Sequence, residues 1–230
     1  MPVKNASVML KYRRAFLIVA AVGMGAVVVA DLWGPRTTSL RQFDPEDVAW
    51  KETEMWRSYY GRERLRLFNQ LAALLRRQYR LPLLRSYVVA FHGAKAAFIF
   101  KDGANRTDYE RALPDLLDYY SAIRRISDTP FDTDRAARLE LEWWIVHRER
   151  DNRPRTDLDE ALAALAAEVY GLPAAQFRDH GRYRGEAMLL RDRLSEQIGV
   201  TEADWQKIHE LLRLSWLSLW NAVNPTIPSP

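Results

Sequence analysis

From residue 44 to residue 224, apolar positions recur every three or four residues, which is the period of amphipathic helices. No alternating strand pattern, glycine-rich phosphate loop or fixed-period repeat interrupts this periodicity. The pattern predicts an all-α protein, in which an N-terminal transmembrane or signal-anchor helix precedes one bundle of about eight helices. The helices that we expect in the bundle cover residues 44–60, 63–79, 83–100, 108–126, 132–149, 156–170, 183–198 and 201–223.

Several of these segments begin and end at residues that favour helix termini. Asp44, followed by Pro45, and Thr201 are N-cap residues, and Gly61 and Pro82 end helices. The segment 83–100 is apolar nearly all round, which predicts a central, buried helix. Its polar residues argue against a second membrane span; they are Arg85, His92 and Lys95.

The N-terminal segment carries a separate signal, an uninterrupted apolar run from Ala15 to Ala30. Four cations precede the run, and no acidic residue occurs before Asp31; the cations are Lys4, Lys11, Arg13 and Arg14. Cations before an apolar run keep the N-terminus in the cytoplasm and place the chain after the run outside. We therefore expect a single-pass protein of the cytoplasmic (inner) membrane. Its parts are a cytoplasmic basic segment 1–14, an anchor 15–33, a linker 34–43, an extracytoplasmic helical domain 44–224 and a proline-rich tail 225–230.

Two details of this segment leave alternatives to a retained anchor. Val28 and Ala30 are small residues at positions −3 and −1 of a cleavage before Asp31, which would release a secreted or periplasmic domain. The run Arg13-Arg14-Ala-Phe-Leu resembles the core of a twin-arginine export signal. The resemblance covers only these residues, with Tyr12 where such signals carry Ser or Thr and Ile18 where they carry Lys. No resemblance to a known family extends over the whole chain.

Charge and cysteine content narrow the function classes. The net charge is +4, and the four cations of residues 1–30 account for all of it, so the domain is neutral. A neutral domain has no electrostatic basis for binding a phosphate backbone, and we expect no nucleic-acid partner. The absence of cysteine excludes disulfides, cysteine-ligated zinc and a thiol nucleophile. No cofactor is predicted.

Four polar residues fall on helix faces that should be buried. Glu52 lies at the centre of an apolar face, Glu140 and His147 share a broad face with Trp143 and Trp144, and His92 lies on the segment 83–100. A buried carboxylate without a partner costs several kcal/mol. We interpret the glutamates as part of a buried network with tyrosine hydroxyls and one or more of Arg85, Lys95 and His147.

Two functional alternatives use the same residues. A metal site would use Glu52, Glu140 and His147, and a general acid–base site would use Glu140, His147, Glu52 and His92. No Glu-x-x-His motif occurs, which argues against a ferritin-like di-iron centre. His180 lies in a stretch rich in Arg, Asp and Gly, and we expect it to be exposed.

The function that the sequence favours is therefore a non-enzymatic interaction or scaffold module tethered to the membrane. Its expected partners are the lipid bilayer, through residues 15–33, and another protein. This interpretation predicts an exposed apolar patch. The alternative, a metal- or cofactor-binding enzyme, predicts that the candidate glutamates and histidines meet in one accessible cavity.

Overall fold

The computed structural model describes residues 3–197 and 199–225. This part of the chain is about four-fifths helical and contains no strand, only an isolated bridge between Thr38 and Ser127. The all-α prediction is confirmed. Of the predicted tail 225–230, all but Pro225 lies outside the described residues.

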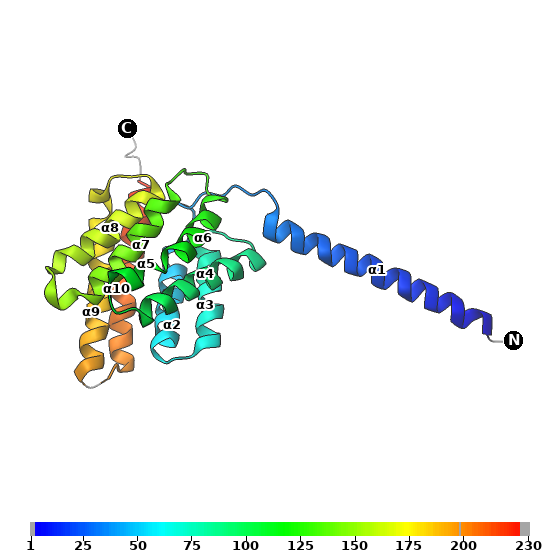
Figure 1. The fold of residues 1–230 in the computed structure, drawn as a ribbon, viewed down its shortest axis with the longest axis horizontal. Coiled ribbons are helices and arrows are strands. Elements are labelled where there is room, and N and C mark those ends of the chain that lie inside the picture. Colours follow the sequence, from blue (N-terminus) through cyan, green and yellow to red (C-terminus); the bar gives the residue numbers. More distant parts are fainter. Residues whose placement is uncertain (1–2, 198, 226–230) are drawn as a thin grey trace.

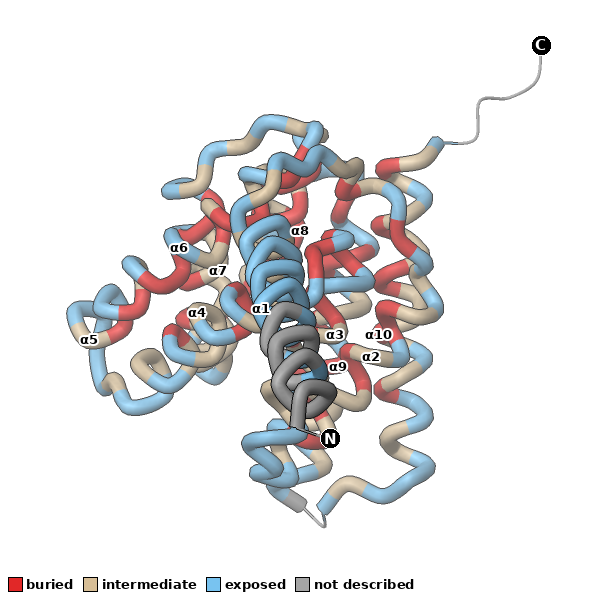
Figure 2. The backbone as a smooth tube through the Cα atoms, turned by 90° about the vertical axis from the view of Figure 1, so that its right-hand side faces the viewer, coloured by how far each residue is buried: buried red, intermediate tan, exposed pale blue. Residues whose placement is uncertain are grey.

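Helix α1, Val3–Trp33, extends away from the rest of the chain (Figure 1). It begins well before the predicted start of the anchor at residue 15 and includes most of the basic segment 1–14. Its stretch Phe16–Trp33 is long and apolar enough to cross a membrane, and none of that stretch is buried against the domain. Figure 2 shows this stretch in the colour of exposed residues. An exposed apolar helix of this kind fits a membrane anchor or a signal sequence.

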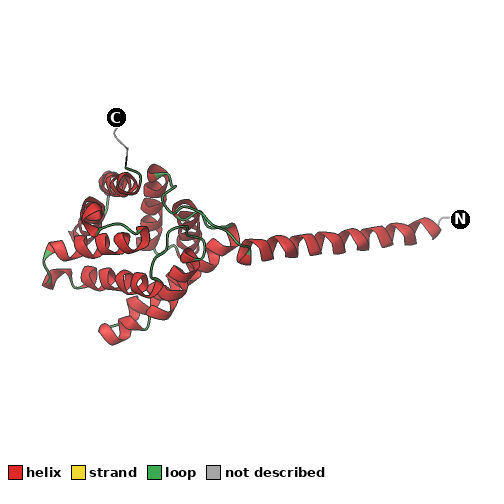
Figure 3. Cartoon of the chain, turned by 90° about the horizontal axis from the view of Figure 1, so that it is seen from above, coloured by secondary structure: helices red, strands yellow, loops and turns green. Residues whose placement is uncertain are grey.

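Nine further α-helices and two 3₁₀ turns make up the domain in the described residues (Figures 1 and 3). The α-helices are α2 Pro45–Tyr60, α3 Arg64–Gln78, α4 Leu83–Asp102, α5 Arg106–Glu110, α6 Leu113–Arg124, α7 Thr133–Arg148, α8 Arg155–Tyr170, α9 Arg178–Gln197 and α10 Glu202–Val223. The 3₁₀ turns cover Arg150–Asn152 and Ala174–Phe177. The predicted caps at the starts of α2 and α10 are confirmed: Asp44 accepts from two backbone amides, and Thr201 forms a capping box with Asp204.

The helix predicted over 108–126 is two helices. Pro114 lies in the first turn of α6, where its missing N–H costs nothing. Within one continuous helix the same proline would lose a backbone hydrogen bond and clash with the preceding turn. The chain therefore ends α5 at Glu110 and starts α6 at Leu113.

Helix α9 starts five residues earlier than predicted, because its glycines serve packing rather than a loop. A Cβ atom on Gly185 would lie 2.6 Å from the carboxylate of Asp159 on α8, and one on Gly181 would overlap the Asp159 carbonyl. The two glycines thus let α9 approach α8 closely. This arrangement places His180 inside the bundle and leaves the Arg184 side chain only 19% exposed, whereas Arg182 stays at the surface.

The helix contacts close into a ring. The neighbours are α2 and α3, α3 and α4, α4 and α6, α6 and α7, α7 and α8, α8 and α9, α9 and α10, and finally α10 and α2. Helix α1 contacts the ring through α4. Side chains that point inward from different helices therefore meet at the centre of the domain.

Helix α4 is not the central, buried helix that its composition predicted. It packs mainly against α3 and α6, with smaller contacts to α1 and α5, and part of its surface stays open. Val88, Phe91 and Phe98 are 45, 56 and 47% exposed. By length and composition α4 could also cross a membrane, but its packing on α3 and α6 and its ion pair from Lys95 to Asp115 on α6 tie it to the domain.

Candidate functional site

The two glutamates singled out in the sequence face the centre of the ring from α2 and α7. Glu52 is fully buried. Its Oε1 accepts hydrogen bonds from Nη2 and Nε of Arg184, at 2.6 and 3.1 Å, and its Oε2 accepts one from the Trp216 indole at 2.5 Å. Helices α9 and α10 therefore supply the partners of a carboxylate on α2. The predicted burial of Glu52 is confirmed, and its cation is Arg184 rather than Arg85, Lys95 or His147.

Glu140 is half-buried and has only neutral donors. The Tyr120 hydroxyl donates to its Oε2 at 2.6 Å, and the Trp144 indole donates to its Oε1 at 3.0 Å. The predicted role of a tyrosine hydroxyl is confirmed here. Every carboxylate oxygen of Glu52 and Glu140 thus has at least one donor, as the burial of charged groups requires.

Arg184 joins the two carboxylates electrostatically. Its side chain is 19% exposed and its guanidinium lies 5.5 Å from the centre of the Trp143 ring. Burial disfavours the charged form of Arg184, but the charges of Glu52 and Glu140 outweigh burial, and the pKa of Arg184 is raised. The guanidinium is therefore permanently charged and holds two negative groups from helices that are not neighbours in the ring.

Buried tyrosine hydroxyls surround this network and remain neutral. Burial, followed by the charge of Glu140, raises the pKa of Tyr119 and of Tyr120. Burial also raises the pKa of Tyr79 and of Tyr170. We name the cluster of Glu52, Glu140, Arg184, Tyr120, Trp144 and Trp216 the central network.

The two candidate histidines lie elsewhere. His147 is paired with Asp192 on α9, with 3.0 Å between Nε2 and Oδ2. Burial works against ionisation of Asp192, but the hydrogen bond and charge of His147, helped by Arg150, hold its pKa below the ordinary value. His92 Nδ1 lies 3.3 Å from the carboxylate of Asp115 on α6. The structure therefore brings Glu52 and Glu140 together and places each histidine with its own aspartate.

Arg85 also departs from its predicted place. It is buried at the start of α4, and its guanidinium donates to the carbonyl oxygens of Asp31 and Gly34, at 3.1 and 3.0 Å. The side chain thus satisfies carbonyl groups at the end of α1, which have no partner within the helix. From its position on a buried face of α4, the sequence analysis expected Arg85 to pair with the glutamates. Its long side chain instead reaches the end of α1.

His180 is a correction to the sequence analysis, because it is 4% exposed rather than solvated. Its Nδ1 lies 2.8 Å from the hydroxyl of Ser215, which is fully buried on α10. Burial, with a further contribution from Arg184, lowers the pKa of His180 to about 3. The geometry is that of a serine with an adjacent base, but both residues are buried between α9 and α10.

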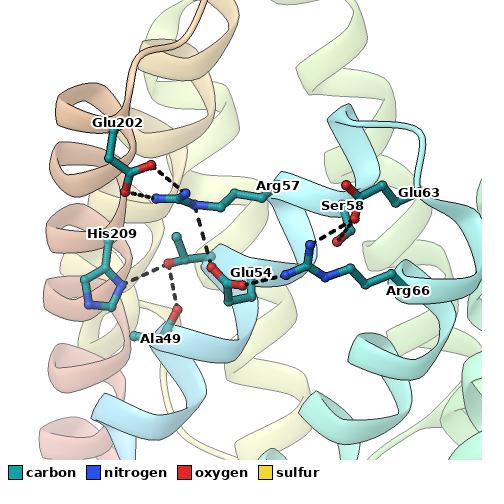
Figure 4. A network of polar contacts seen from close by, with 9 residues as sticks. Ala49, Glu54, Arg57, Ser58, Glu63, Arg66, Glu202 and His209 are labelled. Carbon is teal, nitrogen blue, oxygen red and sulfur yellow. Dashed lines mark hydrogen bonds and ion pairs between the residues drawn. The ribbon is translucent and has the colours of Figure 1, made fainter.

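A second polar network lies between α2, α3 and α10 (Figure 4). His209 Nδ1 lies 2.9 Å from the hydroxyl of Thr53, which donates to the carbonyl of Ala49. Beside it runs a chain of alternating ion pairs formed by Glu202, Arg57, Glu54, Arg66 and Glu63. These exposed pairs bridge three helices and each contributes little free energy.

Two surface hollows of the domain lie away from the central network. One hollow of about 510 Å³ lies between the Arg150–Asn152 turn, α8 and α9, and another of about 280 Å³ lies between α5, α6 and α7. Glu52, Glu140 and Arg184 line neither of them. Within the described residues, no three His, Asp or Glu side chains lie close enough to hold a metal ion.

The exposed side of α4 is the feature that the sequence analysis missed. Val88, Phe91 and Phe98 follow one another at helical spacing, and all three are about half exposed. We name these three residues the α4 stripe. Periodicity alone did not reveal it. A helix that is apolar all round has the same sequence pattern whether other helices pack against all of its surface or only against part of it.

Comparison with known proteins adds no further constraint. No protein-family model, curated protein or solved structure matches this chain.

Proposed function

We propose that this protein is a membrane-anchored interaction module that binds another protein through the α4 stripe. Helix α1 is the single membrane span, with the N-terminus in the cytoplasm and the helical domain on the outer face of the cytoplasmic membrane. The apolar run Ala15–Ala30 and the cations before it support this arrangement.

The observation that carries the proposal is the α4 stripe itself. Single exposed apolar residues are normal on protein surfaces, but adjoining ones mark sites of contact. Val88, Phe91 and Phe98 occupy one side of α4 over about 15 Å, taking 1.5 Å for each residue. On the neighbouring α6, Leu117 is 37% exposed. The size and spacing suit a helix laid against α4.

The position of the stripe indicates where its partner comes from. The side chain of Asp31, in the last turn of α1, accepts hydrogen bonds from the backbone amides of Leu84 and Arg85, at 2.9 and 3.0 Å. The end of the membrane helix therefore caps the start of α4, a role that Pro82 at the N-cap position cannot fill. Because α4 starts at the end of the anchor and the stripe begins about one turn later, we expect its partner to be a helix of another protein held at the same membrane.

Charge defines the partner further. Lys95 lies between Phe91 and Phe98 along the stripe and is 53% exposed, although it is paired with Asp115. A partner helix that covers the stripe must accommodate this ammonium group. We expect it to present apolar residues at helical spacing with a carboxylate opposite Lys95.

Photo-crosslinking tests this proposal: the full chain, with a photoreactive amino acid in place of Phe91, is irradiated in membranes of the cells that produce it. The matched control carries the same residue at position 65, because Leu65 is 83% exposed and isolated at the start of α3. We expect a product of defined mass from position 91 that disappears in the V88S/F98S variant. Adducts with lipid alone, a product of two copies of this chain, or equal labelling at both positions would contradict the proposal.

A further inference from the structure

The junction between α1 and the domain gathers three cations. Arg85 donates to the carbonyl groups of Asp31 and Gly34 at the end of α1. The linker after α1 pairs with the segment after α6: the amide of Thr38 donates to the carbonyl of Ile126 at 2.7 Å, and that of Asp128 donates to the Thr38 carbonyl at 3.0 Å.

This pairing brings the side chains just before it into one region. Arg36 precedes Thr38 in the linker, and Arg125 precedes Ile126 at the end of α6. Burial lowers the pKa of Arg85, and the nearby charges of Arg125 and Arg36 lower it further, against the opposing charge of Asp31. The backbone hydrogen bonds and these mutual charges therefore bring the three arginines together at the base of α1. Figure 1 shows the blue linker meeting the domain at this junction. We name Arg36, Arg85 and Arg125 the arginine collar.

The acidic groups of this region form no ion pair with the two exposed arginines of the collar. The carboxylate of Asp31 is turned to the backbone amides at the start of α4. Asp128 is exposed and accepts a hydrogen bond from the hydroxyl of Thr129. Arg36 and Arg125 are exposed, and neither takes part in an ion pair within the described residues. Many other arginines of the domain, such as Arg57, Arg138 and Arg213, are paired with carboxylates.

The location of the collar identifies its ligand. Arg36 comes three residues after the membrane stretch Phe16–Trp33, and Trp33 is 72% exposed. If α1 spans the bilayer, the collar lies at the level of the lipid headgroups, where tryptophan and basic residues favour the interface. Arginine forms paired hydrogen bonds with phosphate oxygens, and its charge is permanent.

Resting on the membrane attachment proposed above, we infer that the arginine collar binds the phosphate groups of anionic phospholipids and holds the domain against the bilayer surface. Arg85 is fixed by the carbonyl groups of α1 and acts mainly as the rigid base of the collar. Arg36 and Arg125 have free guanidinium groups and make the lipid contacts. The collar thus sets the orientation of the domain, and with it the direction in which the α4 stripe faces.

Fluorescence quenching in reconstituted vesicles tests this inference. The native chain has no cysteine, so the full chain carrying Pro130→Cys, in the exposed loop after α6, takes a single fluorophore. The vesicles contain phosphatidylcholine alone or phosphatidylcholine mixed with phosphatidylglycerol, together with a lipid that carries a quencher on its headgroup. Flotation of the vesicles first shows whether the chain is inserted.

We expect stronger quenching in the anionic vesicles and loss of the difference in R36Q/R125Q. At the free energy typical of a basic residue near an anionic membrane, removing two arginines lowers the ratio of docked to undocked domain by about thirtyfold. The control R62Q/R193Q removes the same charge from exposed positions at the α2–α3 turn and on α9, and should retain the difference.

Quenching that is equal in the two kinds of vesicle, or unchanged in R36Q/R125Q, would overturn the inference while leaving the anchor intact. Loss of quenching in both double variants would also overturn it, because net charge rather than the collar would then govern docking. Failure of the chain to float with either kind of vesicle would instead show that the proposed membrane attachment is wrong, and the inference would fall with it.

Discussion

Glu52 and Arg184 are 132 positions apart in the sequence, yet they form the ion pair at the centre of the domain, with 2.6 Å between Oε1 and Nη2. Because Glu52 is fully buried and Arg184 is also close to Glu140, the pair holds α2, α7 and α9 in one arrangement. A buried pair of this kind gains little net free energy but penalises the loss of either partner.

The variant Arg184→Met should destabilise the domain by about 3–5 kcal/mol, because it leaves a buried carboxylate without a cation. The double variant E52Q/R184M should cost clearly less than the sum of the two single changes, since both charges are then gone. Guanidinium denaturation of the full chain in detergent, followed by tryptophan fluorescence, gives the four stabilities of this cycle. Additive effects would show that the two side chains are not coupled.

Removing the hydroxyl of Tyr120 should lower the free energy of unfolding more than removing that of a buried tyrosine without a hydrogen-bond partner. Tyr120→Phe removes one of the two donors to Glu140, and a hydrogen bond to a charged group is worth about 1.5–3 kcal/mol. Tyr170 is equally buried, but its hydroxyl has no hydrogen-bond partner among the described residues, so Tyr170→Phe should be close to neutral. Equal losses in the two variants, measured by the same denaturation, would contradict the assignment of Glu140 to the central network.

The burial of His180 predicts a dependence of stability on pH. Its pKa is about 3 in the folded protein and about 6.5 when unfolded, so below pH 6.5 the unfolded state binds a proton that the folded state does not. The titration of His180 therefore leaves the free energy of unfolding unchanged above pH 6.5 and decreases it as the pH falls from 6.5 towards 3. At pH 5 the decrease amounts to about 2 kcal/mol. His180→Gln should be less stable at pH 7.5 but should lose about 2 kcal/mol less than the parent between pH 7.5 and pH 5. Parallel pH profiles for the two proteins would show that His180 is accessible to protons.

Close packing of α8 and α9 should make Gly181 intolerant of a side chain. A Cβ there overlaps the backbone carbonyl of Asp159, which cannot rotate away, so Gly181→Ala should cost about 1–3 kcal/mol. Gly25→Ala in α1 is the control, because no atom of the structure lies within 4 Å of the added carbon. A thermal melt of Gly181→Ala that matches the parent would mean that α9 lies farther from α8 than the structure shows.

The sequence could predict the features of the fold that depend on local patterning. Helix period and caps such as Asp44 and Thr201 correctly placed most helices, and the wheel position of Glu52 correctly indicated its burial. The partner of Glu52 could not be predicted, because Arg184 lies between two glycines whose close packing has no signature in a single sequence. The same glycines made a helix look like a loop and hid the burial of His180.

The open side of α4 illustrates the other limit of sequence patterning. Phe91 and Val89 look alike in sequence, yet Phe91 is 56% exposed and Val89 is fully buried. Only the packing of α3 and α6 on one side decides between them. A helix whose exposed side is apolar therefore resembles a core helix until its neighbours are known, and such a side is where binding surfaces escape sequence analysis.

The measurement that tests the central claim most directly is the accessibility of single cysteines to a membrane-impermeant maleimide. The chain has no cysteine of its own, so Ser7→Cys and Thr37→Cys report separately on the two sides of the membrane that the run Ala15–Ala30 is proposed to cross. In intact cells we predict labelling of Thr37→Cys on the full-length chain, and labelling of Ser7→Cys only after the cells are permeabilised. Labelling of Thr37→Cys on a product shortened by about thirty residues would show cleavage near Ala30 instead of a retained anchor. Protection of Thr37→Cys in intact cells would contradict the orientation, and with it the placement of the domain outside the membrane.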